Sequence, residues 1–383
     1  AKAEQGQPLK GNWKDGRAGA EWLDADVKTL EPIIQKAFDE TGAFRANLFE
    51  LPTGEAGRTY LEDLNTWLSR VAIRTGYERI AMKIAMILPH LLLQRPGMRT
   101  PKKMITETMN RRMRLWRNGE IGELLEEAKR IQRENKRQLQ RKEQEENEKM
   151  RQSFVRFMQR GEVNQASKSL TQGNVKGGVL PINADTVQEL EKKHPKDELA
   201  EAEVLIEEKG QIDSGYFEVI DENFVKKIAS QIKGASGPSG ANSHAWRRWC
   251  LAYRGTSDKL CRTIAILTRR LATEQVPFEV IEALVRGRLL PLDKCPGIRP
   301  VGVGEVLRRL ISKIVASRCR NEIQETAGHL QLCAGQPAGC EAAAKAMLDL
   351  WRQPQVEIIL LVDADNAFNR LNRTVTLNNL YYT

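Results

Sequence analysis

The sequence has few of the residues that hold structural zinc or build a disulfide framework. It contains six cysteines and four histidines among 383 residues, and no two cysteines are spaced as CxxC. The cysteines are Cys250, Cys261, Cys295, Cys319, Cys333 and Cys340. We therefore expect no zinc site and an environment that keeps thiols reduced, with cysteines that mainly act as small buried apolar residues.

A long apolar run is also missing. The most apolar segment, 80–93, is interrupted by Lys83, Pro89 and His90. It is too short and too broken to cross a bilayer, so we expect a packed helix and no membrane partner. The first residues show no charged start followed by an apolar stretch, so no signal peptide is expected. The sequence does not begin with Met and is interpreted as an excerpt of a longer product.

Negative charge is in deficit. Sixty Lys and Arg residues stand against fifty Asp and Glu residues, which gives a net charge of +10. A basic balance of this size suits a polyanionic partner, with nucleic acid first and an anionic membrane second. An ordinary solvated basic surface is the alternative, and charge alone does not separate these readings.

Composition divides the chain into five parts. We predict a disordered tail at 1–20, a helical domain of unknown role at 21–103, a basic and charged helical linker at 104–160, a loop-rich connector at 161–218 and a globular part at 219–383. The apolar face of one helix in the second part consists of Leu61, Leu64, Trp67, Leu68 and Val71, which recur every three or four residues.

The linker at 104–160 alternates Glu with Lys and Arg at helical spacing and has few apolar positions. This pattern is typical of a solvated single helix that is held by ion pairs between residues four apart. A coiled coil is not expected because a sustained apolar seam is missing. An arm that contacts nucleic acid remains an alternative.

Two segments of the globular part predict defined local structure. The segment 224–250 predicts a helix, a loop rich in Gly, Ser and Pro, and a second helix. The segment 288–320 predicts a β-hairpin with Lys294 on one arm and Arg299 on the other, followed by a helix with an apolar face and a basic face. Such a hairpin could hold a triphosphate and a nucleic-acid backbone, or it could be an ordinary surface hairpin.

The segment 356–363 reads VEIILLVD and predicts a strand buried on both faces that ends in Asp363. Burial of a lone carboxylate is costly unless a cation pairs with it, and Mg²⁺ with phosphate oxygens is one solution. The alternative is an acid near a helix start, with Asp365 or Asn366 as the cap. The metal-binding interpretation requires Asp363 to be shielded from bulk water and close to the turn between Lys294 and Arg299.

Four segments in this order, over residues 215–380, resemble the reverse transcriptases of retroelements of the non-LTR type. The family's loop G-x-APGPDG is resembled by KGASGPSGANSHAWRRW, and its fingers motif P-x-x-K-x-G-x-R-P-I by PLDKCPGIRPVGVGEVLRRLISKIV. The family's Q-x-G-F-x-x-G-x-S-T is matched in place by LQLCAGQPAGCEAAAKAM, and its first palm motif D-x-x-x-A-F-D/N by LLVDADNAFNRLNR. The order of the four segments carries the resemblance, since each motif alone is weak.

The resemblance implies an α+β, predominantly helical fold, with the fingers and the start of the palm of a right-hand polymerase at 219–383. It implies that Asp363 is the catalytic, metal-binding aspartate and that the carbonyl of Ala364 is a second ligand for Mg²⁺ or Mn²⁺. The implied residues for the incoming dNTP are Lys294, Arg299 and Phe368. The implied residues for nucleic acid, an RNA template with a DNA primer, are Arg308, Arg309 and Lys313.

The chain departs from the family because the x-x-D-D motif and the thumb are missing. Two-metal nucleotidyl transfer needs at least two converging carboxylates, so we expect this chain to be inactive by itself. We interpret it as part of an RNA-directed DNA polymerase of a retrotransposon, in an intracellular and nuclear location as in the family. The alternatives are a non-catalytic RNA- or DNA-binding protein derived from such an element, and a helical scaffold.

Overall fold

The computed structural model describes residues 26–97, 100–159, 179–194, 213–294, 297–328, 337–363 and 367–380. Helices make up 66% of the protein, and the described residues form one two-stranded antiparallel sheet. The predominantly helical fold is therefore confirmed. In the N-terminal half the helices are α1 (Val27–Thr41), α2 (Glu55–Ala72), α3 (Glu78–Leu92), α4 (Lys102–Arg117), α5 (Ile121–Gln159) and α7 (Ala184–Lys193).

The C-terminal half adds shorter helices and the sheet. In chain order its elements are the 3-10 helix η2 (Ser214–Phe217), α8 (Glu222–Ser230), α9 (Ser243–Leu251), α10 (Gly255–Thr273), α11 (Phe278–Val285), β1 (Gly287–Asp293), β2 (Ile298–Gly304), α12 (Val306–Arg318), α13 (Arg320–Ala327), α14 (Gly339–Trp351), α15 (Ala367–Arg370) and α16 (Arg373–Leu380). The predicted helix–loop–helix and hairpin are both confirmed by α8, α9, β1 and β2.

The amphipathic pattern predicted for α2 is confirmed. Its five apolar positions are all buried, with exposed fractions of 1% or less. The predicted packed helix at 80–93 corresponds to α3, which is buried along almost its whole length. Its interrupting cation is satisfied: Lys83 Nζ lies 2.8 Å from a carboxylate oxygen of Glu282 in α11 and donates to Gln35 in α1. A buried lysine is tolerated there because both partners are close.

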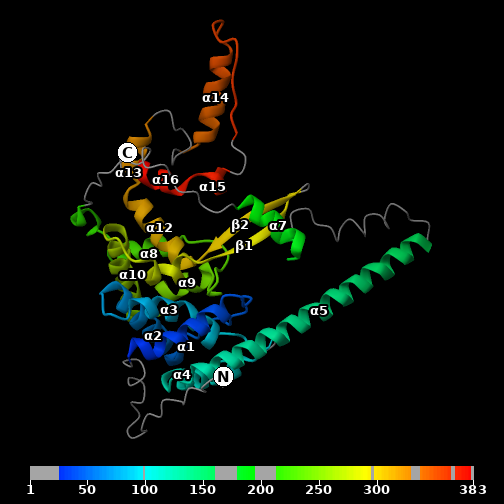
Figure 1. Cartoon of the computed structure of the whole chain (residues 1–383), viewed down its shortest axis with the longest axis vertical. Coiled ribbons are helices and arrows are strands. Elements are labelled where there is room, and N and C mark those ends of the chain that lie inside the picture. Colours follow the sequence, from blue (N-terminus) through cyan, green and yellow to red (C-terminus); the bar gives the residue numbers. More distant parts are fainter. Residues whose placement is uncertain are drawn as a thin grey trace, which may run out of the picture.

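One continuous core joins the two halves of the chain. The helices α2 and α10 pack together, as do α3 and α11 (Figure 1). The rings of Tyr60 in α2 and Trp249 in α9 lie 5.6 Å apart, and the hydroxyl of Tyr253 donates to the carbonyl of Leu51 at 2.7 Å. The N-terminal helices and the start of the C-terminal part are therefore packed as one unit.

The charged segment after residue 103 begins inside this core. Met109, Met113 and Trp116 of α4 are buried, and so are Leu124 and Ala128 of α5. Beyond this point α5 runs out as a single helix that leaves the rest of the protein (Figure 1). Its 39 residues span about 58 Å at the usual helical rise.

The buried strand predicted for 356–363 is wrong. These residues lie in no strand or helix, and Leu360 and Val362 are 82% and 84% exposed. A strand is buried on both faces only when it belongs to a sheet whose two faces are covered by other elements. Within the described residues the sheet consists of β1 and β2, and the segment 356–363 is not part of it.

Candidate nucleic-acid interface

The hairpin places two free cations next to its turn. The amide of Lys294 donates to the carbonyl of Gly297 at 3.0 Å, and Arg299 lies opposite Leu292 in the register. The side chains of Lys294 and Arg299 are exposed and pair with no acid of the described chain. Free cations at the end of a two-stranded arm suit contact with phosphate oxygens.

The segment 179–194 supports the hairpin from one side. The amide of Leu180 donates to the carbonyl of Pro291 in β1 at 2.8 Å. Lys193, at the end of α7, donates to the carbonyl of Ile298 in β2 at 2.7 Å. A two-stranded ribbon alone is only marginally stable, so these two bonds help to hold the hairpin in place.

The Gly-rich loop packs against the start of α12. The buried carboxylate of Glu305 accepts hydrogen bonds from the amide of Ser239 at 2.6 Å and from its hydroxyl at 2.7 Å. A Cβ on Gly237 would lie 2.8 Å from the backbone of Glu305 and from the carbonyl of Gly304. The two motifs therefore form one unit, although Ser239 and Glu305 lie 66 positions apart in the sequence.

The three cations of α12 that the resemblance implies for nucleic acid have different surroundings. Arg309 donates to the carbonyls of Lys233 and Ala235, so its guanidinium holds the Gly-rich loop. Arg308 is exposed and donates to one backbone carbonyl, and Lys313 is exposed. Of these three, Arg308 and Lys313 are thus the cations that face solvent.

A buried histidine of α3 holds the other side of the Gly-rich loop. The carbonyl of Pro238 lies 2.7 Å from Nε2 of His90, so this nitrogen donates. The His90 ring stands edge-on to Phe44 at 5.5 Å and fills the space next to Gly240, whose φ is +79°. Arg288 of β1 donates to the carbonyl of the same Pro238 at 3.2 Å.

Burial dominates the electrostatics at this junction. It lowers the pKa of His90 to about 4, and the nearby charge of Arg288 acts in the same direction. Burial also raises the pKa of Glu305, although the Ser239 hydrogen bonds and the charges of Arg288 and Arg309 oppose that shift. The junction therefore favours a neutral imidazole next to an arginine-rich network.

Asp363 does not have the surroundings that a metal-binding role requires. It is exposed, at the end of the unpaired segment 356–363. Because this carboxylate is not buried, it needs no cation to offset a cost of burial. The polymerase interpretation required Asp363 to be shielded from bulk water, and its exposure in this structure argues against that interpretation.

Two further residues implied for metal and nucleotide fall outside what the structure describes. Ala364 lies outside the described residues, and Phe368 belongs to α15 without a described side chain. No group of three or more His, Cys, Asp or Glu residues that could hold a metal occurs in the described part of the chain. A magnesium ion needs several oxygen donors around one point, so these residues alone do not fit it.

Sequence reasoning missed His90, Arg288 and Glu305 as the residues that join the helical part to the loop. His90 was noticed only as an interruption of an apolar run. A polar residue within such a run signals a buried partner, but the sequence does not say which one. Glu305 directly precedes the apolar face of α12, which is the only local signal that it carries.

Comparisons with known proteins give no relative. No protein-family model, curated protein or solved structure matches this chain. No polymerase fold is identified. Among the described helices, none has the length and apolar character that a membrane crossing needs.

Proposed function

We propose that this chain is the nucleic-acid-binding part of a retroelement reverse transcriptase. The observation that carries the proposal is the packing of the Gly-rich loop onto the start of α12 through Ser239 and Glu305. Two segments that resemble separate motifs of that family thus lie together, with the free cations Lys294 and Arg299 on the adjoining hairpin. In the proposal residues 219–383 correspond to the fingers and the start of the palm, although the segment 356–363 forms no palm strand in this structure.

The partners in this proposal are an RNA template, a DNA primer and a dNTP, in the nucleus. Lys294 and Arg299 contact the triphosphate, and Arg308 and Lys313 contact the template backbone. Arg309 acts indirectly, since it holds the loop at 233–235. Asp363 would bind Mg²⁺ or Mn²⁺ only with further carboxylates that the described residues do not supply.

The exposure of Asp363 favours a second candidate, a non-catalytic RNA- or DNA-binding protein derived from such an element. The exposed carboxylate of Asp363 has no cluster of acids around it in the described chain. In that case the basic surfaces act alone. Both candidates predict an affinity for nucleic acid that falls steeply with salt, whereas a helical scaffold predicts none.

Primer extension separates the two candidates. An in-frame x-x-D-D within about a hundred residues downstream of Thr383 would support the enzyme, in keeping with the usual size of a domain. The protein that includes this region should then extend a DNA primer on RNA, and Asp363→Asn should abolish extension while affinity for the primer–template stays unchanged. Extension by the Asp363→Asn variant would remove this residue from catalysis. A stop codon directly after Thr383 would favour the binding protein.

A further inference from the structure

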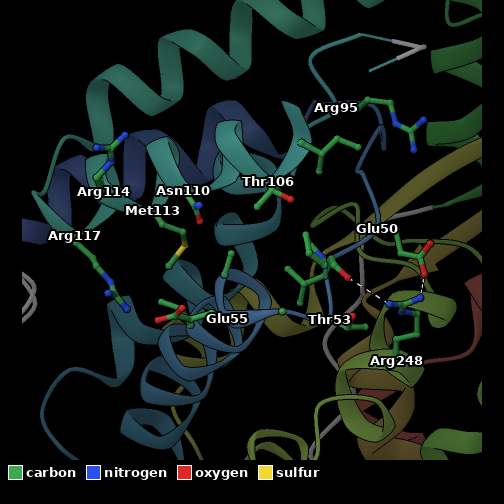
Figure 2. A pocket seen from close by; sticks show the side chains of 16 residues that line it. Glu50, Thr53, Glu55, Arg95, Thr106, Asn110, Met113, Arg114, Arg117 and Arg248 are labelled. Atoms are coloured by element: carbon green, nitrogen blue, oxygen red, sulfur yellow. Dashed lines mark hydrogen bonds and ion pairs between the residues drawn. The ribbon is translucent and has the colours of Figure 1, made fainter. Parts of the chain in front are cut away.

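A groove lies in the N-terminal helical part, and apart from Arg248 its lining lies outside the four segments that resemble family motifs. It runs between α2, α4 and the segment 50–56 and has a volume of about 1080 Å³. Figure 2 shows Arg95 at one end of the groove and Arg114 and Arg117 at the other. The volume is at the upper end of the range for binding sites of small molecules, so the groove has room for a segment of a polymer.

The free charge in the groove is positive. Arg248 forms an ion pair with Glu50, and Arg117 lies 3.5 Å from a carboxylate oxygen of Asp63. Arg95 and Arg114 form no ion pair with the rest of the described chain. The groove therefore holds two uncompensated guanidinium groups, while Glu55 is the acid that remains on its wall.

One face of α4 continues this charge along the groove. Four residues of α4 line the groove at intervals of three and four positions: Thr106, Asn110, Arg114 and Arg117. This spacing puts them on one side of a helix, and exposed Lys103 extends the same side by one more step. The face thus carries cations at its two ends and hydrogen-bonding side chains between them, and both kinds of group can contact phosphate and sugar oxygens.

We infer that this groove binds the sugar–phosphate backbone of a single strand of RNA. Guanidinium groups at both ends match anions that repeat along a polymer, and the hydroxyl and amide groups between them match phosphate and ribose oxygens. No aromatic side chain of the described residues lines the groove, so these residues offer no platform for base stacking. We therefore expect little preference for sequence.

The concave shape favours a single strand over a duplex. Proteins read a duplex with a convex element that enters one of its grooves, whereas a flexible strand can follow a hollow surface. The inference goes beyond the proposed function, because it concerns α2, α4 and segment 50–56 and not the hairpin or Asp363. A chain that binds RNA here and never extends a primer would still satisfy it.

The test measures the binding of fluorescent oligouridine of about 12 nucleotides, which is within the usual site size for such grooves. Fluorescence anisotropy on the full chain compares the wild type with the double variant Arg95→Ala/Arg114→Ala. Loss of two phosphate contacts should weaken binding roughly tenfold at about 50 mM salt and reduce the salt slope by about 1.4. Arg117 is left intact because its partner Asp63 is largely buried.

The matched control is Lys28→Ala/Lys36→Ala, which removes two exposed cations of α1 that do not line the groove. Only the groove variant should lose affinity and salt slope. Equal losses of affinity in both variants would show that only net charge matters and would contradict the site. No loss of affinity in the groove variant would also exclude the site. Equal sensitivity of duplex RNA, or of polyglutamate, to the groove variant would overturn the assignment to a single RNA strand. A parallel arm with oligodeoxythymidine tests whether the ribose contributes.

Discussion

Glu305 and Ser239 form a buried pair in which one carboxylate accepts two hydrogen bonds from one residue. Replacing Glu305 by Ala leaves the amide and the hydroxyl of Ser239 buried without this acceptor. We expect the free energy of unfolding to fall by about 1–3 kcal/mol, the usual cost of unsatisfied buried groups. Urea unfolding followed by circular dichroism measures it. Ser239→Ala is the control and should cost less, since the backbone bond remains.

Gly237 is required because the loop touches the backbone at the start of α12. In Gly237→Ala the new Cβ would lie 2.8 Å from backbone atoms of Glu305 and Gly304, which have little room to move. Overpacking of this kind costs about 1–3 kcal/mol. The matched variant Gly302→Ala meets no atom within 4 Å and should leave stability nearly unchanged. Equal melting temperatures for the two variants would contradict the packing.

His90 predicts a loss of stability in acid. Its pKa is lowered from 6.5 to about 4 in the folded protein, so the unfolded chain binds the proton first as pH falls. The contribution of neutral His90 to the free energy of unfolding is fully present above pH 6.5 and is lost as pH falls towards 4. Its size is on the order of 3 kcal/mol. Chemical unfolding at several pH values between these limits measures the change.

A matched variant isolates the contribution of His90 from that of other groups. Burial raises the pKa of Asp63 from 3.8 to about 6, which favours the folded state at lower pH and opposes the His90 effect in the same window. The comparison of the wild type with His90→Gln removes this overlap, because Gln can donate to Pro238 and does not titrate. Parallel stability curves for the two proteins would show that His90 is not the cause.

Arg299 tests the role of the hairpin in the proposed enzyme. In the longer protein Arg299→Ala should raise the apparent KM for dNTP with a smaller effect on kcat, because an exposed cation near a triphosphate contributes mainly to binding. Steady-state primer extension measures both constants. Arg45→Ala removes another exposed arginine outside the hairpin and should change neither. An unchanged KM in Arg299→Ala would leave the hairpin a purely structural role.

The local sequence pattern was enough to predict those elements whose structure depends on neighbours along the chain. The apolar spacing of α2, the hairpin around Gly297 and the apolar face of α12 are all predicted by residues within a few positions of each other. The periodicity of a helix and the chemistry of a turn are encoded over such short distances. The exposed cations Lys294 and Arg299 follow directly from the hairpin.

Only the tertiary structure decided which groups meet across the chain. The segment 356–363 has the composition of a buried strand, yet it is exposed, and no strand of the described chain pairs with it. The same holds for the bond from His90 to Pro238, which joins residues 148 positions apart. The sequence by itself determined the helices, the hairpin and the basic charge. Packing determined the environment of Asp363, the partners of Arg309 and the groove, because burial and pairing depend on residues distant in sequence.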